Sequence, residues 1–182
     1  MLGCYKQPNK SSYINLMFAT VHTASGLLIA SKISNPWWIF FIGLISHYLI
    51  DLIPHGDRHL EDGLYNADTK KNKVILKIIL IILIDLTISC SLVIYYLMIN
   101  SWVNWQNTIL AVFVVLLPDF LMGLAKITNL FKLENSKNFL IKLNLKIYKV
   151  HIKVHNFFPS KMPLTVGLII QLALIIIFLK SI

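Results

Sequence analysis

The sequence predicts an all-α fold: a polytopic membrane helical bundle with about five transmembrane helices and one cytoplasmic amphipathic helix. Hydrophobic residues make up 57% of the 182 residues, against roughly 45–50% apolar residues in soluble domains. Several stretches of about 18 residues or more carry few or no charges, enough for a helix to cross a ~30 Å hydrocarbon core. Strand-like alternation of apolar and polar residues is absent from the sequence, so helices are expected to make the crossings.

The apolar stretches define five expected spans within one integral membrane domain over residues 1–182. These spans cover residues 14–33, 36–53, 74–99, 105–125 and 163–179. A polar loop, 55–73, follows the second span, and a Lys-rich segment, 126–161, follows the fourth.

Basic residues are distributed unevenly between the two sides of this predicted bundle. Of the 17 Lys and Arg residues, only Lys32 and Lys180 lie on one side, and the remaining 15 lie on the other. Because Lys and Arg accumulate in cytoplasmic loops, we expect a multi-pass cell-membrane protein with a cytoplasmic N-terminus and an outside C-terminus. The net charge of +9 is then explained by topology, and no nucleic-acid partner is expected. An aromatic belt at the outer interface is also expected, made by Trp37, Trp38, Trp102 and Trp105.

The Lys-rich segment contains an expected amphipathic helix at the membrane surface. Spacings of three and four residues place four lysines on one helical stripe, namely Lys142, Lys146, Lys149 and Lys153. These lysines are expected to contact water or anionic lipid headgroups. His151 and His155 lie roughly opposite the stripe, and an ordinary interfacial helix does not explain two histidines on the inward side.

Ionisable side chains inside the expected spans require a reason, because an Asp at the centre of a span costs about 2.5–3.5 kcal/mol on insertion scales. Five histidines and aspartates occur there: His22, His47, Asp51, Asp85 and Asp119. At about 1.5 Å rise per residue, three of them lie roughly 9–12 Å from the cytoplasmic ends of their spans, while Asp51 is shallower and Asp85 deeper. Most of the set therefore shares one layer on the cytoplasmic side. A purely structural interhelical hydrogen bond explains Asp85 equally well.

Two pairs at helical spacing indicate metal binding. In His47-x-x-x-Asp51 and His151-x-x-x-His155, both ligand atoms of each pair lie on one helix face. Imidazole and carboxylate together suit a divalent metal, with zinc favoured and manganese or iron as alternatives.

The loop after Asp51 supplies further candidates. A proline and a glycine at positions 54 and 56 would end the helix and turn the chain, bringing His55 and Asp57 back over the pair. Asp57 is the expected general base for a water molecule activated by the ion. The expected metal ligands are His22, His47, Asp51, His55, Asp119, His151 and His155. This set exceeds the roughly three protein ligands of a catalytic site, so two ions, or outer partners of one ion, are both expected arrangements.

Short motifs carry a resemblance to a known family. Residues 46–51 read Ser-His-Tyr-Leu-Ile-Asp and are followed by Leu-Ile-Pro at 52–54. This resembles the "SHxLxD…P" signature of the membrane-bound metal-dependent hydrolases (the YdjM-type, LexA-regulated group). His22, before the small residues 23–26, is similar to an early histidine of that family, and 116–119 resembles its "LLPD" element. That family is distantly similar to zinc-dependent phospholipase C. The resemblance implies metal-dependent hydrolysis, with a phosphoester as the expected substrate.

We therefore expect a membrane-embedded metal-dependent hydrolase that acts at the cytoplasmic side on a phosphoester or lipid-linked substrate. Its expected partners are the lipid bilayer and anionic headgroups. A divalent-cation or proton transporter and a non-catalytic membrane scaffold are the alternatives. The stretches 39–43 and 92–98 carry no charge, so no polar path leads outward from the ionisable layer, which disfavours transport. The scaffold alternative predicts no bound metal.

Overall fold

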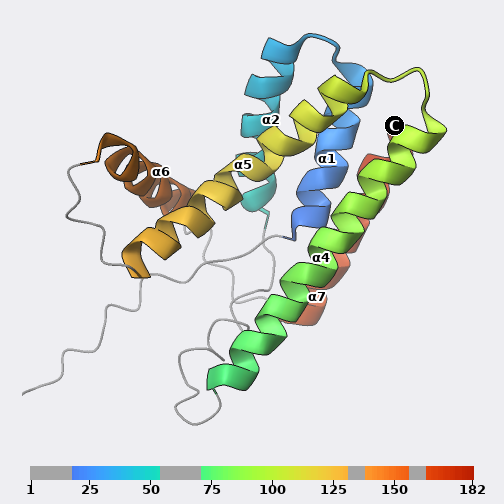
Figure 1. Cartoon of the computed structure of the whole chain (residues 1–182). Coiled ribbons are helices and arrows are strands. Elements are labelled where there is room, and N and C mark those ends of the chain that lie inside the picture. Colours follow the sequence, from blue (N-terminus) through green and yellow to red (C-terminus); the bar gives the residue numbers. More distant parts are fainter. Residues whose placement is uncertain (1–17, 54–70, 131–137, 156–162) are drawn as a thin grey trace, which may run out of the picture.

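The computed structural model describes residues 18–53, 71–130, 138–155 and 163–182 (Figure 1). All regular structure within these ranges is helical, which confirms the all-α prediction for this part of the chain. The helices are α1 (Ala19–Lys32), α2 (Pro36–Asp51), α4 (Lys71–Ile99), α5 (Trp105–Leu130), α6 (Phe139–His155) and α7 (Leu164–Lys180).

Two of these helices are long and apolar enough to cross a membrane. The segments that qualify are Ile79–Ile99 in α4 and Trp105–Ala125 in α5, each 21 residues long. The helices α1, α2 and α7 are shorter, at 14, 16 and 17 residues. At about 1.5 Å per residue, a 14-residue helix is about 21 Å long, less than the core of a bilayer. Of the five predicted spans, two therefore correspond to described helices that are long and apolar enough to cross a membrane.

The predicted boundaries differ from the observed helices mainly at two places. The first expected span began at residue 14, whereas α1 begins at Ala19, and residues 14–17 lie outside the described ranges. The helix α5 continues to Leu130, so residues 126–130 are not part of a separate surface segment as predicted. No proline or glycine separates Ala125 from Leu130, so nothing in the chain stops the helix there.

The helices pack around α1 and α5. In Figure 1, α1 and α2 form a short antiparallel hairpin, α5 crosses both, and α6 lies beside the lower half of α5. The helix α1 contacts α2, α4, α5 and α7, whereas α6 contacts α5 and α2. The hairpin turn is fixed by Asn35, whose side-chain oxygen accepts hydrogen bonds from the backbone N–H of Trp37 (2.9 Å) and Trp38 (3.4 Å). This is the usual capping arrangement at a helix N-terminus, and Pro36 in the first turn suits it.

Glycines let α1 and α2 approach α5 closely. A Cβ atom on Gly26 would lie 3.1 Å from Cα and 3.2 Å from the backbone nitrogen of Val112, and one on Gly43 would lie 2.9 Å from Cγ1 of Val114. Small residues at such positions allow close helix–helix packing, as is common in membrane bundles. Gly26 follows His22 by four residues and Gly43 precedes His47 by four, so each histidine lies on the face of its helix that meets α5.

Asp85 of α4 binds the N-terminus of α1 inside the bundle. Its carboxylate accepts hydrogen bonds from Ala19 N (2.6 Å), Thr20 N (3.1 Å) and the Thr20 hydroxyl. Gln171 of α7 accepts a further hydrogen bond from Phe18 N at 3.0 Å. The first N–H groups of a helix have no partner within it and carry partial positive charge, so a carboxylate satisfies both needs. The structural explanation of Asp85 therefore agrees with the observed contacts.

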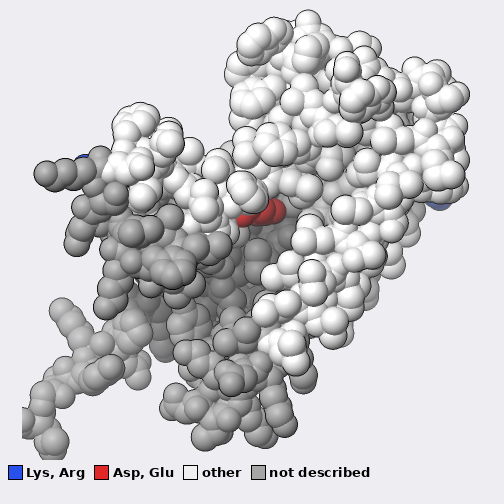
Figure 2. All heavy atoms as spheres, viewed as in Figure 1, with Lys and Arg blue, Asp and Glu red and all other residues white. Residues whose placement is uncertain are grey.

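Much of the surface is apolar and nearly free of charge. Figure 2 shows acidic atoms of the described residues in one recess near the centre of this face, next to uncharged described residues. Large apolar side chains are exposed along α4 and α7, among them Leu80, Leu83, Ile94, Ile169 and Leu172. A protein in water rarely exposes so much contiguous apolar surface, so these helices face an apolar environment or a partner.

Candidate metal centre

Four helices bring histidine and aspartate side chains together. His22 lies in the first turn of α1, and His47 and Asp51 lie in the last two turns of α2. Asp119 follows Pro118 within α5, and His151 lies near the end of α6. The three histidines and Asp51 are buried, whereas the side chain of Asp119 is 24% exposed. The cluster is therefore closed on most sides, with one carboxylate open to its surroundings.

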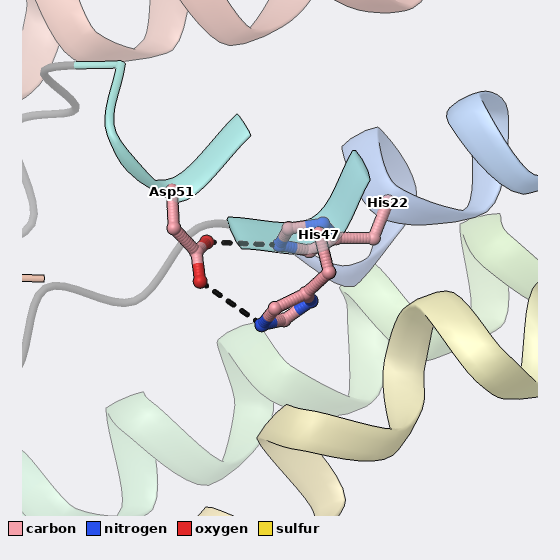
Figure 3. A group of neighbouring side chains, drawn as sticks. All are labelled: His22, His47 and Asp51. Atoms are coloured by element: carbon pink, nitrogen blue, oxygen red, sulfur yellow. Dashed lines mark ion pairs between the residues drawn. The ribbon is translucent and has the colours of Figure 1, made fainter. Parts of the chain in front are cut away.

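The Asp51 carboxylate faces the imidazoles of both α1 and α2 from one side (Figure 3). Its Oδ1 is 3.3 Å from Nε2 of His22, and its Oδ2 is 2.9 Å from Nε2 of His47. The two imidazole rings stack, with centroids 4.3 Å apart.

Asp119 extends the cluster toward α6. Its Oδ1 lies 3.8 Å from Nε2 of His151 and 3.9 Å from Nε2 of His47, and its Oδ2 lies 3.8 Å from Nε2 of His22. Two groups of side chains could each hold a metal ion: His22–His47–Asp51 and His47–Asp119–His151. Within each group, the ligand atoms all lie within 4.8 Å of one another. Around a tetrahedral zinc ion, ligand atoms are about 3.3 Å apart, given Zn–N distances of about 2.0–2.1 Å. The observed separations bracket that value.

A backbone contact fixes the orientation of the His47 ring. Its Nδ1 lies 2.7 Å from the carbonyl oxygen of Val115 in α5. Because a carbonyl oxygen only accepts, Nδ1 must carry the proton and donate. In the neutral ring, Nε2 then directs a lone pair at Oδ2 of Asp51. Two such electron-rich atoms 2.9 Å apart require a cation between them, either a proton or a metal ion.

His22 offers an independent test of whether the residues fit a metal. Among the described residues, neither Nδ1 nor Nε2 of its fully buried ring has a hydrogen-bond partner. A buried polar atom without a hydrogen bond is costly, and metal-ligating histidines normally satisfy one nitrogen through the ion. The donor set of imidazoles and carboxylates, without a thiolate, suits zinc, manganese or iron. The residues present therefore fit a divalent cation.

Several predicted site residues fall outside this description. His55 and Asp57, the expected ligand and general base, belong to residues 54–70, which the structure does not describe. His155 ends α6, but its side chain is also outside the described part. Of the seven predicted ligands, the structure brings five together and leaves these two histidines as predictions.

Sequence reasoning missed the residues that hold the cluster in place. Tyr48 contacts both His47 and His151, with ring centroids 5.3 Å and 5.8 Å apart. Asn144 of α6 is buried against α5. In the amide orientation that satisfies both groups, it donates to Leu121 O (3.1 Å) and accepts from Ala125 N (3.2 Å). Asn144 precedes His151 by two helical turns, so this spacing could have signalled a shared inward face.

The spacing of glycine and histidine is a further signal that the sequence offered. Gly26 and Gly43 each lie one helical turn from a histidine, and a small residue there marks close helix contact.

Comparison of the chain with protein-family models, curated proteins and solved structures finds no match.

Proposed function

We propose that the protein is a membrane-embedded, metal-dependent hydrolase. Its ion, with zinc as the first candidate and manganese or iron as alternatives, would be held by His22, His47, Asp51, Asp119 and His151. The observation that carries this proposal is the pairing of His47 with Asp51. The Val115 carbonyl commits Nδ1 of His47 as a donor, so Nε2 faces the carboxylate as a second electron-rich atom. A metal ion between them would satisfy both atoms and also a nitrogen of His22, whose ring has no hydrogen-bond partner among the described residues.

The five ligand groups exceed what one catalytic ion requires. Catalytic zinc sites commonly use about three protein ligands and keep a position open for water. The two possible ligand sets share His47, but one imidazole nitrogen binds only one ion. Two ions would therefore be bridged by a carboxylate, with Asp119 best placed because it is near all three histidines. Otherwise one ion is bound, and the remaining groups orient its ligands.

The proposed reaction is hydrolysis of a phosphoester. A bound divalent ion polarises a phosphoryl oxygen and lowers the pKa of water toward about 7. In the reaction, the water oxygen forms a bond to phosphorus, the ester P–O bond breaks, and the departing alkoxide takes a proton. Asp57 remains the proposed base, although it lies outside the described residues. Asp119, with 24% of its side chain exposed, is the described carboxylate most open to an entering substrate.

The membrane location is proposed from helix length and surface character. The two membrane-length helices α4 and α5 support insertion, as do the apolar side chains exposed on α4 and α7. Five spans with the lysine-rich side in the cytoplasm extend this proposal. The connections α1–α2 and α4–α5 and the C-terminus lie at the same end of the structure (Figure 1), as the proposed topology requires. The tryptophans near those connections suit an interface.

The decisive experiment is elemental analysis of protein purified in detergent without a polyhistidine tag. We expect one or two equivalents of zinc, manganese or iron in the wild type. The His47→Ala/Asp51→Ala variant should lose them and should not hydrolyse p-nitrophenyl phosphodiesters. Cys4→Ser/Cys90→Ser is the matched control, because Cys90 is an exposed thiol that could bind zinc adventitiously. Metal content and hydrolysis that survive in the double alanine variant would refute the proposal.

Transport of cations or protons is the rival function, and the deeper position of Asp85 in its span keeps it as an alternative. The hydrogen bonds of Asp85 to the N-terminus of α1 give this carboxylate a structural role, which favours the hydrolase. Uptake of zinc or protons by liposomes containing the purified protein would reverse that preference. A scaffold without catalytic function would bind no metal in the elemental analysis.

A further inference from the structure

A groove of about 680 Å³ lies between α2 and α6, next to the metal centre. Its walls carry the aliphatic side chains of Ile45, Leu49, Leu52, Val150 and Val154. The other two lining residues are Tyr48 and Lys153. The groove is thus lined almost entirely by carbon atoms, those of Tyr48 and Lys153 included.

Tyr48 connects the groove to the cluster of histidines. The same side chain that lines the groove packs edge-on against His47 at 5.3 Å and lies 5.8 Å from His151. A molecule lying in the groove is therefore separated from two proposed metal ligands by a single aromatic ring.

We propose that the groove binds a hydrocarbon chain of an anionic phospholipid, whose phosphate is bound by Lys153. Only the further step, that the bound lipid is the substrate, rests on the proposed function. Binding of the lipid does not require hydrolysis. The aliphatic walls favour an occupant without polar groups along its length. Lys153 supplies charge for a phosphate, and Lys149 and Lys146 lie on the same stripe of α6.

A polypeptide segment fits this groove poorly. An extended or irregular peptide would bring backbone N–H and C=O groups that need hydrogen-bond partners when buried. Tyr48 and Lys153 are the only lining side chains that could supply them. A lipid chain makes no such demand, and a protein whose exposed helices are this apolar is surrounded by lipid chains.

The test measures lipid retention by metal-free protein, so that hydrolysis plays no part. Protein treated with a chelator is mixed with micelles of phosphatidylglycerol or phosphatidylcholine, and retained lipid is counted by native mass spectrometry. Leu49→Trp fills the groove, and Leu172→Trp on α7 is its matched control, since both leucines are 58% exposed. We expect Leu49→Trp to lower retention at least tenfold and Leu172→Trp to leave it unchanged. Val150→Trp fills the opposite wall and should act like Leu49→Trp.

The headgroup is tested with charge variants. Lys153→Gln should remove the preference for phosphatidylglycerol over phosphatidylcholine, whereas Lys180→Gln, at the end of α7, should keep it. Equal lipid retention by Leu49→Trp and Leu172→Trp would mean that lipid is bound only around the protein and not in the groove, which would overturn the proposal. A change of oligomeric state in Leu49→Trp without loss of lipid would assign the groove to a second copy, which also overturns it.

The outcomes separate this inference from the proposed function. Lipid retention that depends on Leu49, in a protein that contains no metal as purified and takes up none when zinc, manganese or iron is added, would uphold the groove and refute the hydrolase. Normal metal content and phosphodiester hydrolysis, with lipid retention that does not depend on Leu49 or Val150, would uphold the hydrolase and refute lipid binding in the groove. Metal content of each tryptophan variant shows that its fold is intact, because the metal ligands come from four helices.

Discussion

Nδ1 of His47 lies 2.7 Å from the carbonyl oxygen of Val115. This contact joins α2 to α5 and directs the other ring nitrogen, Nε2, toward Asp51 and Asp119. One helix thus sets the tautomer of a histidine on another, as outer partners commonly do for metal ligands. Pro118 directly precedes Asp119 inside α5. A proline has no backbone N–H, so one hydrogen bond of the helix is missing next to the site.

The variant His47→Asn tests the two ring nitrogens of His47 separately. The amide nitrogen of asparagine takes the place of Nδ1 and can still donate to Val115 O, but no atom replaces Nε2. We expect the metal-free variant to unfold at a lower temperature than metal-free wild type, because the buried Asp51 loses its partner Nε2. Its metal affinity should fall by more than the about 10–100-fold that loss of an outer partner costs. Isothermal titration with zinc measures this affinity, and unchanged affinity would exclude Nε2 as a ligand.

Gly26→Ala should destabilise the fold. The added Cβ would lie 3.1–3.2 Å from backbone atoms of Val112, which cannot move aside as a side-chain end can. Overpacking of this kind costs typically about 1–3 kcal/mol. Gly123→Ala is the matched control, since nothing lies within 4 Å of its new Cβ and alanine favours a helix by about 1 kcal/mol. Denaturant unfolding in detergent should move in opposite directions for the two variants.

Asp85→Ala should destabilise α1 because the N–H groups of Ala19 and Thr20 lose their acceptor. Leaving buried donors unsatisfied costs about 1–3 kcal/mol. Asp85→Asn keeps one acceptor oxygen and should lose less stability. Thermal unfolding in detergent ranks the three proteins. Wild-type stability of Asp85→Ala would contradict the capping role of this residue and restore a functional reading of it.

Removal of the metal should lower the unfolding temperature. A ligand present at 100 times its Kd stabilises the folded state by about 2.7 kcal/mol. Each kcal/mol shifts Tm by about 2–4 °C in a chain of this size, so a decrease of about 5–10 °C is expected on chelation. Differential scanning fluorimetry before and after re-addition of zinc measures the shift. The His47→Asn variant should show no shift, and an equal shift in both proteins would point to zinc bound elsewhere.

Asn144→Leu should weaken metal binding through His151. Asn144 holds α6 on α5 by contacts with Leu121 O and Ala125 N, and His151 reaches Asp119 from the same helix. If Asn144 acts by positioning His151, the loss of zinc affinity in Asn144→Leu/His151→Ala will be smaller than the sum of the single losses. Strict additivity in this double-mutant cycle would mean that Asn144 affects the centre by another route.

The sequence by itself determined which segments are helical and where chemistry is expected. Long apolar runs bounded by polar or proline-containing stretches define α2, α4, α5 and α7 to within a few residues. The cost of burying charge marked the five histidines and aspartates of the spans. Helical periodicity also paired His47 with Asp51, because residues four apart share a face whatever the tertiary fold.

Only the tertiary structure decided which of these residues meet. His22 reaches Asp51 because α1 and α2 both pack closely on α5, at Gly26 and Gly43. His151 reaches Asp119 because α6 packs against α5. Asp85 could be assigned only once the N-terminus of α1 was placed against it. Periodicity fixes the face of a single helix, but contacts between helices depend on how closely and at what angle they pack. That geometry depends on the side chains of both partners together.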